Sequence, residues 1–65
     1  MIMEFQGVQP SIASDVFIAP SADIIGDVTI GEQSSVWFGC VIRGDVNSIT
    51  IGKRTSIQDL SMIHV

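Results

Sequence analysis

Aliphatic residues recur at every sixth position over most of this 65-residue chain. The pattern forms two runs that are offset by three residues: Ile12, Ile18, Ile24, Ile30, Val36 and Ile42, then Ile51, Ile57 and Ile63. An amphipathic helix would place apolar residues three and four positions apart, and an amphipathic strand would alternate strictly, so neither template fits. A fixed short period predicts a repeat structure of short strands and turns.

A second series strengthens the first, because a small or β-branched residue follows most of these aliphatic residues by four positions. Its members are Val16, Ala22, Val28, Ser34, Cys40, Val46, Thr55 and Ser61. We expect both series to point inward, with three six-residue units closing a triangular coil and coils stacking about 4.8 Å apart. The offset predicts a loop of three extra residues around 46–49 at a corner. Residues 1–11 are predicted as an N-terminal lead-in whose first strand covers the open end, and residues 12–65 as the solenoid.

The register also predicts where polar side chains lie. Units three apart should stack on one face, so Arg43 and His64, each one position after an aliphatic residue, should be outward neighbours in adjacent coils. Trp37 and Gln58 are related in the same way on another face. With the acidic residues at the adjoining turns, one outer edge is predicted to gather the following residues: Arg43, Asp45, Gln58, Asp59 and His64.

Simpler interpretations of these residues remain open. Arg43 with Asp45 or Asp59 forms an ion pair in the simplest interpretation, at a subunit contact, and a lone histidine such as His64 is more often a surface residue than a ligand. Trp37 and the adjacent Phe38 should pack against a neighbouring subunit or the lead-in. Cys40 is expected to be inert filler.

Charge and composition exclude several partners. The net charge of −4 and the three basic residues leave no basic surface for nucleic acid or an anionic membrane. No apolar run reaches the roughly 20 residues of a membrane span, and the N-terminus lacks the basic region of a signal peptide. A single cysteine cannot form an internal disulfide. We therefore expect a cytoplasmic protein.

The order and spacing of short motifs are more specific to a family than the six-residue period is. Six segments contain these motifs: 26–31 (GDVTIG), 35–38 (SVWF), 41–46 (VIRGDV), 49–52 (ITIG), 54–59 (RTSIQD) and 63–65 (IHV). In this order and spacing, from about Asp15 to the last residue, the chain resembles the γ-class carbonic anhydrase-like hexapeptide-repeat family, which includes ferripyochelin-binding-protein-like homologues.

The resemblance implies an all-β fold, a left-handed parallel β-helix, here with about three coils and shortened at its C-terminal end. It implies a homotrimer with zinc, or iron or cobalt, held between subunits by three histidines. His64 matches the first ligand, and Gln58 matches the residue that orients the metal-bound hydroxide. Arg43, Asp45 and Asp59 match a charged group at the trimer contact and the bicarbonate side.

The family's other two histidines form an H-x4-H pair about two coils further on, beyond this sequence. Ser56 stands where the family commonly has Asn, Leu60 where it has Gly, and the loop at 46–49 offers no carboxylate as a proton shuttle. Because catalytic zinc needs three protein ligands, we predict that this chain alone binds no metal stably and is inactive.

Three functions follow as hypotheses. The first is the N-terminal part of a γ-carbonic anhydrase-like protein, which hydrates carbon dioxide. The second is a hexapeptide acyltransferase that uses a histidine as general base on an acyl-CoA thioester. The third is a non-catalytic assembly module stabilised by oligomerisation.

Overall fold

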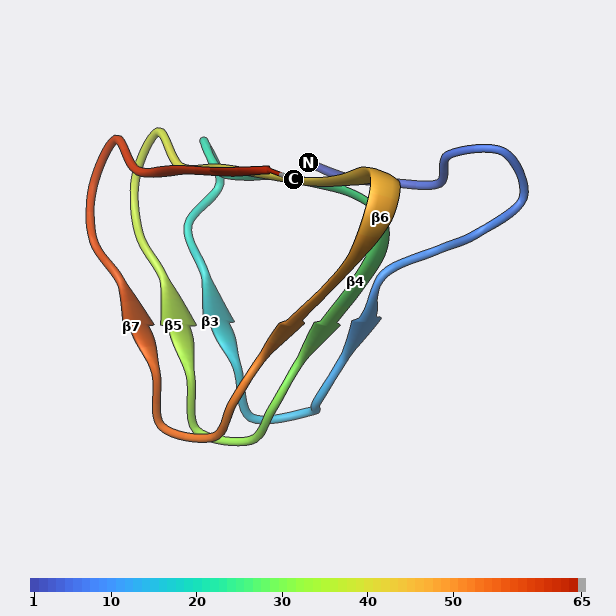
Figure 1. Cartoon of the computed structure of the whole chain (residues 1–65). Helices are drawn as coiled ribbons and strands as arrows, with labels where there is room; N and C mark the ends of the chain where they lie inside the picture. The colour runs from blue at the N-terminus through green and yellow to red at the C-terminus, as the bar shows by residue number, and fades with distance from the viewer. Residues whose placement is uncertain (65) are drawn as a thin grey trace.

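The computed structural model describes the backbone of residues 1–64 and the side chains of residues 1–63. Seen along its axis, the chain winds round a triangle with a strand on each side (Figure 1). The strands of the described part are β1 (Ile2–Met3), β2 (Ser11–Ile12), β3 (Phe17–Ile18), β4 (Asp23–Ile30), β5 (Ser35–Val36), β6 (Val41–Ile51), β7 (Ser56–Ile57) and β8 (Met62–His64). All paired strands are parallel. Residues 1–64 contain no helix long and apolar enough to span a membrane.

The triangle has three faces, each a stack of strands from successive coils. The first face contains β2 and the second halves of β4 and β6, the second contains β3, β5 and β7, and the third contains β1, the first halves of β4 and β6, and β8. The aliphatic stacks are Ile12/Ile30/Ile51, Ile18/Val36/Ile57 and Ile24/Ile42/Ile63. The predicted stacks are therefore confirmed.

The core is a column of inward side chains from both series. Ile24, Val36 and Ile42 are fully buried in the middle of the column. The small residues of the second series are equally well packed there, since Ala22 and Cys40 are also fully buried. Towards the C-terminal end, Ile57 and Ile63 are only half-buried. Packing is thus densest where a coil has neighbours on both sides.

One predicted inward position is wrong. Val46 is 75% exposed, and Ile49 takes the inward place beside Val28, where it is buried. The three extra residues enter before this position, so counting four from Ile42 ends inside the insertion. The inserted corner segment is 45–48, one residue earlier than predicted, and it lies opposite Asp27 alone. Figure 1 shows β4 and β6 passing through this corner as continuous ribbons.

The first ten residues, which we call the N-terminal strap, lie along the third face and then project at the same corner (Figure 1). Strand β1 pairs with β4 through Ile2–Ile24 and Met3–Ile25. The strap then reverses in a tight turn in which Phe5 and Val8 exchange two backbone hydrogen bonds of 2.9 and 3.1 Å. The lead-in therefore contains a first strand, β1, which pairs with β4 on the third face.

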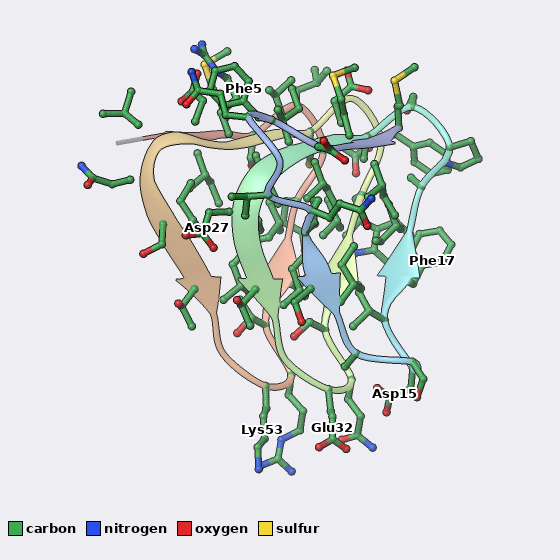
Figure 2. All side chains as sticks on the ribbon, turned by 90° about the vertical axis from the view of Figure 1, so that its right-hand side faces the viewer. Phe5, Asp15, Phe17, Asp27, Glu32 and Lys53 are labelled. Carbon is green, nitrogen blue, oxygen red and sulfur yellow. The ribbon has the colours of Figure 1, made fainter. Side chains whose placement is uncertain are left out.

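The other corners are turns with left-handed backbone. Where the second and third faces meet, Gly39 has a φ of 72° and Leu60, in the next coil, has a φ of 62°. Glycine adopts this conformation freely, whereas an L-residue pays roughly 1–2 kcal/mol for it. At the corner between the first and second faces, charged residues follow one another in successive coils, as Asp15, Glu32 and Lys53 do in Figure 2.

Leu60→Gly should therefore stabilise the fold. Leu60 is 83% exposed, so removing its side chain costs little burial, and relief of the left-handed strain should raise the free energy of unfolding by about 0.5–1 kcal/mol. Urea denaturation followed by circular dichroism measures the change. Gly39→Ala is the opposing control, because it puts a side chain on backbone with a φ of 72°, where an L-residue is strained. A lower unfolding midpoint for Leu60→Gly would contradict the argument.

Candidate functional site at the corner of the third and first faces

The corner where the third face meets the first is centred on an ion pair. Side chains alternate along a strand, so residues two apart point the same way, and Arg43 and Asp45 both leave the coil outward from β6. Nη2 of Arg43 donates to Oδ2 of Asp45 at 2.7 Å. The Asp45 side chain is 18% exposed and that of Arg43 is 45% exposed. Of the two predicted acidic partners, Asp45 is the one that Arg43 contacts.

This contact changes the acidity of Asp45. The hydrogen bond from Arg43, aided by the charge of its guanidinium, lowers the pKa of the Asp45 carboxyl below its ordinary value of 3.8. A lowered folded-state pKa means that the carboxylate favours folding above its ordinary pKa. That contribution disappears as the pH falls through the lowered value. The ion pair is therefore formed throughout the neutral range.

A carboxyl titration followed by carbon-13 NMR tests this electrostatic coupling. We expect the midpoint of Asp45 to lie below 3.8, and Arg43→Gln to move it upward toward that value. Arg54→Gln, which removes an arginine at another corner, should leave the midpoint unchanged. An Asp45 midpoint that does not respond to Arg43→Gln would show that the pair does not exist in solution.

An open cleft of about 330 Å³ lies next to the ion pair, and we call it the corner cleft. One wall is the turn of the strap, and the other is the inserted segment of β6 with the corner of β4. The lining residues are Phe5, Gln6, Val8, Asp27, Gly44, Asp45, Val46, Asn47 and Ser48. Figure 2 shows Phe5 and Asp27 arising from these two separate elements. The cleft thus combines two carboxylates, neutral polar groups and exposed apolar side chains.

Tight backbone packing fixes the floor of the corner cleft. Gly26 pairs with Gly44, and a Cβ added to Gly44 would lie 2.5 Å from the carbonyl oxygen of Asp27. A Cβ added to Gly26 would lie 2.6 Å from the carbonyl oxygen of Gly44. Only residues without a side chain allow β4 and β6 to approach this closely. The aspartates that follow the two glycines are thereby brought to the same corner.

Gln58 and Asp59 belong to a different part of the surface. The amide nitrogen Nε2 of Gln58 donates to Oγ of Ser56 at 2.5 Å. One coil earlier, the indole nitrogen Nε1 of Trp37 donates to Oγ of Ser35 at 2.9 Å in the equivalent position. Asp59 is exposed at the following turn. Within the described residues, no hydrogen bond or ion pair connects either residue to the Arg43–Asp45 pair.

The aromatic residues near Gln58 point outward as predicted. The Trp37 ring lies 4.9 Å from the ring of Phe17 and 6.4 Å from that of Phe38, measured between centroids. Phe38 is 50% exposed. Within the chain, Trp37 therefore packs beside Phe17 on the second face. Cys40 is buried, as predicted for filler.

The backbone register places His64 opposite Arg43, one strand away. This neighbourhood was predicted from the period, whereas the His64 side chain lies outside the described part. Residues with described side chains contain no group of three His, Cys, Asp or Glu that could hold a metal ion.

Sequence reasoning missed two parts of this site. It did not include Asp27, although Gly26-Asp27 repeats Gly44-Asp45 eighteen positions earlier and the register pairs the glycines. It also treated the strap only as a cover. Gln6 and Gly7 have positive φ values of 51° and 82°, which is the geometry of a tight reversing turn. The Gln-Gly pair was the available signal for it.

Comparisons with known proteins agree with this architecture. The sequence model of the bacterial transferase hexapeptide family (six repeats) matches residues 9–44. The chain is 59% identical over 56 residues to γ-carbonic anhydrase 2 of Arabidopsis thaliana mitochondria, which is 86% of this chain and 20% of that protein. It is 52% identical over 64 residues to a carbonic anhydrase of Geobacillus kaustophilus, which is 98% of this chain and 35% of the relative.

A crystal structure described as a putative acetyltransferase from Bacillus cereus superposes with a TM-score of 0.92 and 48% identity. The match covers 94% of this chain and 36% of that one. The chain thus spans between a fifth and about a third of the length of these three proteins. Its parallel stacked strands are those of a left-handed β-helix. On the repeat, the register and these relatives, the chain belongs to the bacterial transferase hexapeptide family as a γ-carbonic anhydrase-like member.

Proposed function

We propose that this chain forms the first coils of a γ-carbonic anhydrase-like protein that hydrates carbon dioxide to bicarbonate. The observation that carries the proposal is the Arg43–Asp45 ion pair in register with His64 in the next coil. The relatives described as carbonic anhydrases support the same reaction. In this proposal the corner of β6 provides the charged part of the site.

Arg43 is the group that we assign to the bicarbonate side. A guanidinium carries five N–H donors in a planar fork that suits carboxylate-like oxyanions. One donor is committed to Asp45 at 2.7 Å, which leaves the others for a planar anion at the exposed edge. Asp45 then acts as a positioning residue. Its lowered pKa keeps the carboxylate ionised at neutral pH, and the ionised carboxylate holds the guanidinium at the corner.

We assign His64 to a metal site between subunits, as one of three histidine ligands, with zinc, iron or cobalt as the ion. Gln58 would orient the attacking hydroxide, and Asp59 would complete the charged group at a trimer contact. A catalytic zinc needs three protein ligands, and the sequence contains one histidine. This chain alone therefore does not fit the metal, and no reaction step is assigned to it in isolation.

The isolated chain is accordingly expected to be inactive. We expect carbon dioxide hydration at the uncatalysed rate in a stopped-flow indicator assay, and no stoichiometric zinc by elemental analysis after dialysis. His64→Ala should have the same zinc content as the parent chain, because one ligand does not hold the ion tightly. Stoichiometric zinc together with accelerated hydration would overturn the proposal of an incomplete site.

Acyl transfer is the second candidate, because the Bacillus cereus neighbour is described as a putative acetyltransferase. In that case His64 would serve as a general base on an acyl-CoA thioester. Titration with acetyl-CoA by calorimetry distinguishes the two. The carbonic anhydrase proposal expects no binding of acetyl-CoA. Saturable binding would favour a transferase if Arg43→Gln weakens it and His64→Ala leaves it intact.

Homotrimer formation is part of the first proposal, and sedimentation equilibrium tests it.

A further inference from the structure

The strap contributes nothing to the hydrophobic core. Its large apolar side chains are all exposed: Met1, Ile2, Met3, Phe5 and Val8, with exposed fractions of 64, 54, 45, 38 and 43%. The cluster of buried core residues begins at Ala22, and the first residue packed against it is Ile12. The strap can therefore leave the body of the solenoid without opening the core.

Its attachment to the body is short. Two residue pairs connect β1 to β4, and the amide of Ile24 donates to the carbonyl oxygen of Met1 at 2.7 Å. The amino group of Met1 also contacts Asp23 at 3.2 Å and the carbonyl oxygen of Ala22. Beyond β1, Phe5 packs over Gly26, where an added Cβ would meet Cβ of Phe5 at 3.4 Å. Segments with few buried contacts open locally at a small fraction of the global free energy of unfolding.

The turn of the strap is closed on itself. Phe5 and Val8 are joined by two hydrogen bonds, and Nε2 of Gln9 donates to Oε1 of Glu4 at 3.4 Å. These contacts do not involve the body of the solenoid, so the turn can move as a unit when β1 separates from β4. Since Phe5, Gln6 and Val8 form one wall of the corner cleft, that movement would change access to its floor.

We propose that the strap is a gate: β1 separates from β4 as a local opening event and swings the Phe5–Val8 turn away from the corner cleft, exposing Gly44 and Asp45 to solutes. Gly44 is buried at the floor when the gate is closed. The opposite wall, segment 45–48, is part of β6 and stays with the solenoid. The gate is independent of which reaction the site supports.

Amide hydrogen exchange of the full chain, read by NMR, tests the opening. The amide of Ile24, which donates to the strap, should exchange at least about tenfold faster than that of Trp37, which donates to Ile57 of the next coil at 3.0 Å. Phe5→Ala should accelerate the exchange of Ile24 about a further tenfold and leave Trp37 unchanged. Phe38→Ala is the matched control, because this similarly exposed phenylalanine is on another face, and it should leave Ile24 unchanged. Equal opening free energies for Ile24 and Trp37 would overturn the proposal.

The consequence for the cleft needs a second measurement. A small neutral nitroxide added to the solution should enhance the relaxation of the Gly44 amide more in Phe5→Ala than in the parent chain. A disulfide between Met3→Cys and Ile25→Cys, which are paired neighbours, should hold the gate closed and reduce the enhancement below the parent value, with reversal by reductant. If Gly44 responds to neither change, the strap opens without gating the cleft and the proposal is wrong.

Discussion

Gly44→Ala is expected to unfold the chain at 25 °C. The added Cβ would lie 2.5 Å from the carbonyl oxygen, 2.7 Å from the carbonyl carbon and 3.0 Å from the nitrogen of Asp27. These are backbone atoms that cannot turn aside like a side chain, so β4 and β6 would have to separate at the corner. Overpacking of this kind costs typically 1–3 kcal/mol and occasionally more, and we expect about 3 kcal/mol here. A short solenoid has little stability in reserve.

Gly52→Ala provides the control. It makes the same chemical change just after the end of β6, but its nearest neighbour would be Oγ1 of Thr55 at 3.8 Å, an ordinary contact. Gly52 is also exposed, so we expect a change within about 0.5 kcal/mol. Far-ultraviolet circular dichroism and urea titration measure both variants. Equal midpoints for the two would mean that the close approach at the corner does not exist.

Ile42→Ala should be the most damaging truncation in the core. Ile42 is fully buried and is stacked between Ile24 and Ile63. Replacing a buried isoleucine with alanine costs about 2–5 kcal/mol, through lost burial and the cavity that remains. In a solenoid each coil contacts only its neighbours, so a cavity in the middle coil weakens the contacts of both adjoining coils.

A gradient along the axis is the signature of this dependence on neighbours. Ile57→Ala makes the same truncation where the side chain is only half-buried, so we expect it to cost about half as much. Ile42→Val removes one methylene and should cost about 0.5–1.5 kcal/mol. Chemical denaturation under identical conditions ranks the three variants. If Ile57→Ala proved as costly as Ile42→Ala, burial between neighbouring coils would not determine the cost of the truncation.

The sequence predicts the repeat well because the six-residue period follows from the backbone geometry of the coil. Each aliphatic residue of the two runs marks this period in the sequence. The stacks and the backbone pairing of Arg43 with His64 were confirmed for that reason. Val46 was assigned wrongly because hydrophobicity alone does not show where an insertion begins; Ile49 was equally eligible.

The corner cleft could not be read from the period. It depends on the path of a non-repetitive strap, whose Phe5 is brought over Gly26 by pairing between segments about twenty residues apart. Arg43 pairs with Asp45 rather than with Asp59 for a local reason, because residues two apart on a strand point to the same side. Gln58 was separated from the pair because it stands on another face, where Ser56 holds its amide. The proposed catalytic roles of these residues stay predictions.

The insertion in β6 separates two properties that are usually linked, chain length and core register. From Ile24 to Ile42 one coil takes 18 residues, whereas from Ile42 to Ile63 it takes 21, yet both pairs are in register. The extra residues leave the triangle at the corner and return with the next inward side chain in place. Segments of other lengths could therefore be grafted between Gly44 and Ile49 without redesign of the core. This makes the corner a natural position for sequence to diversify while the three faces stay constant.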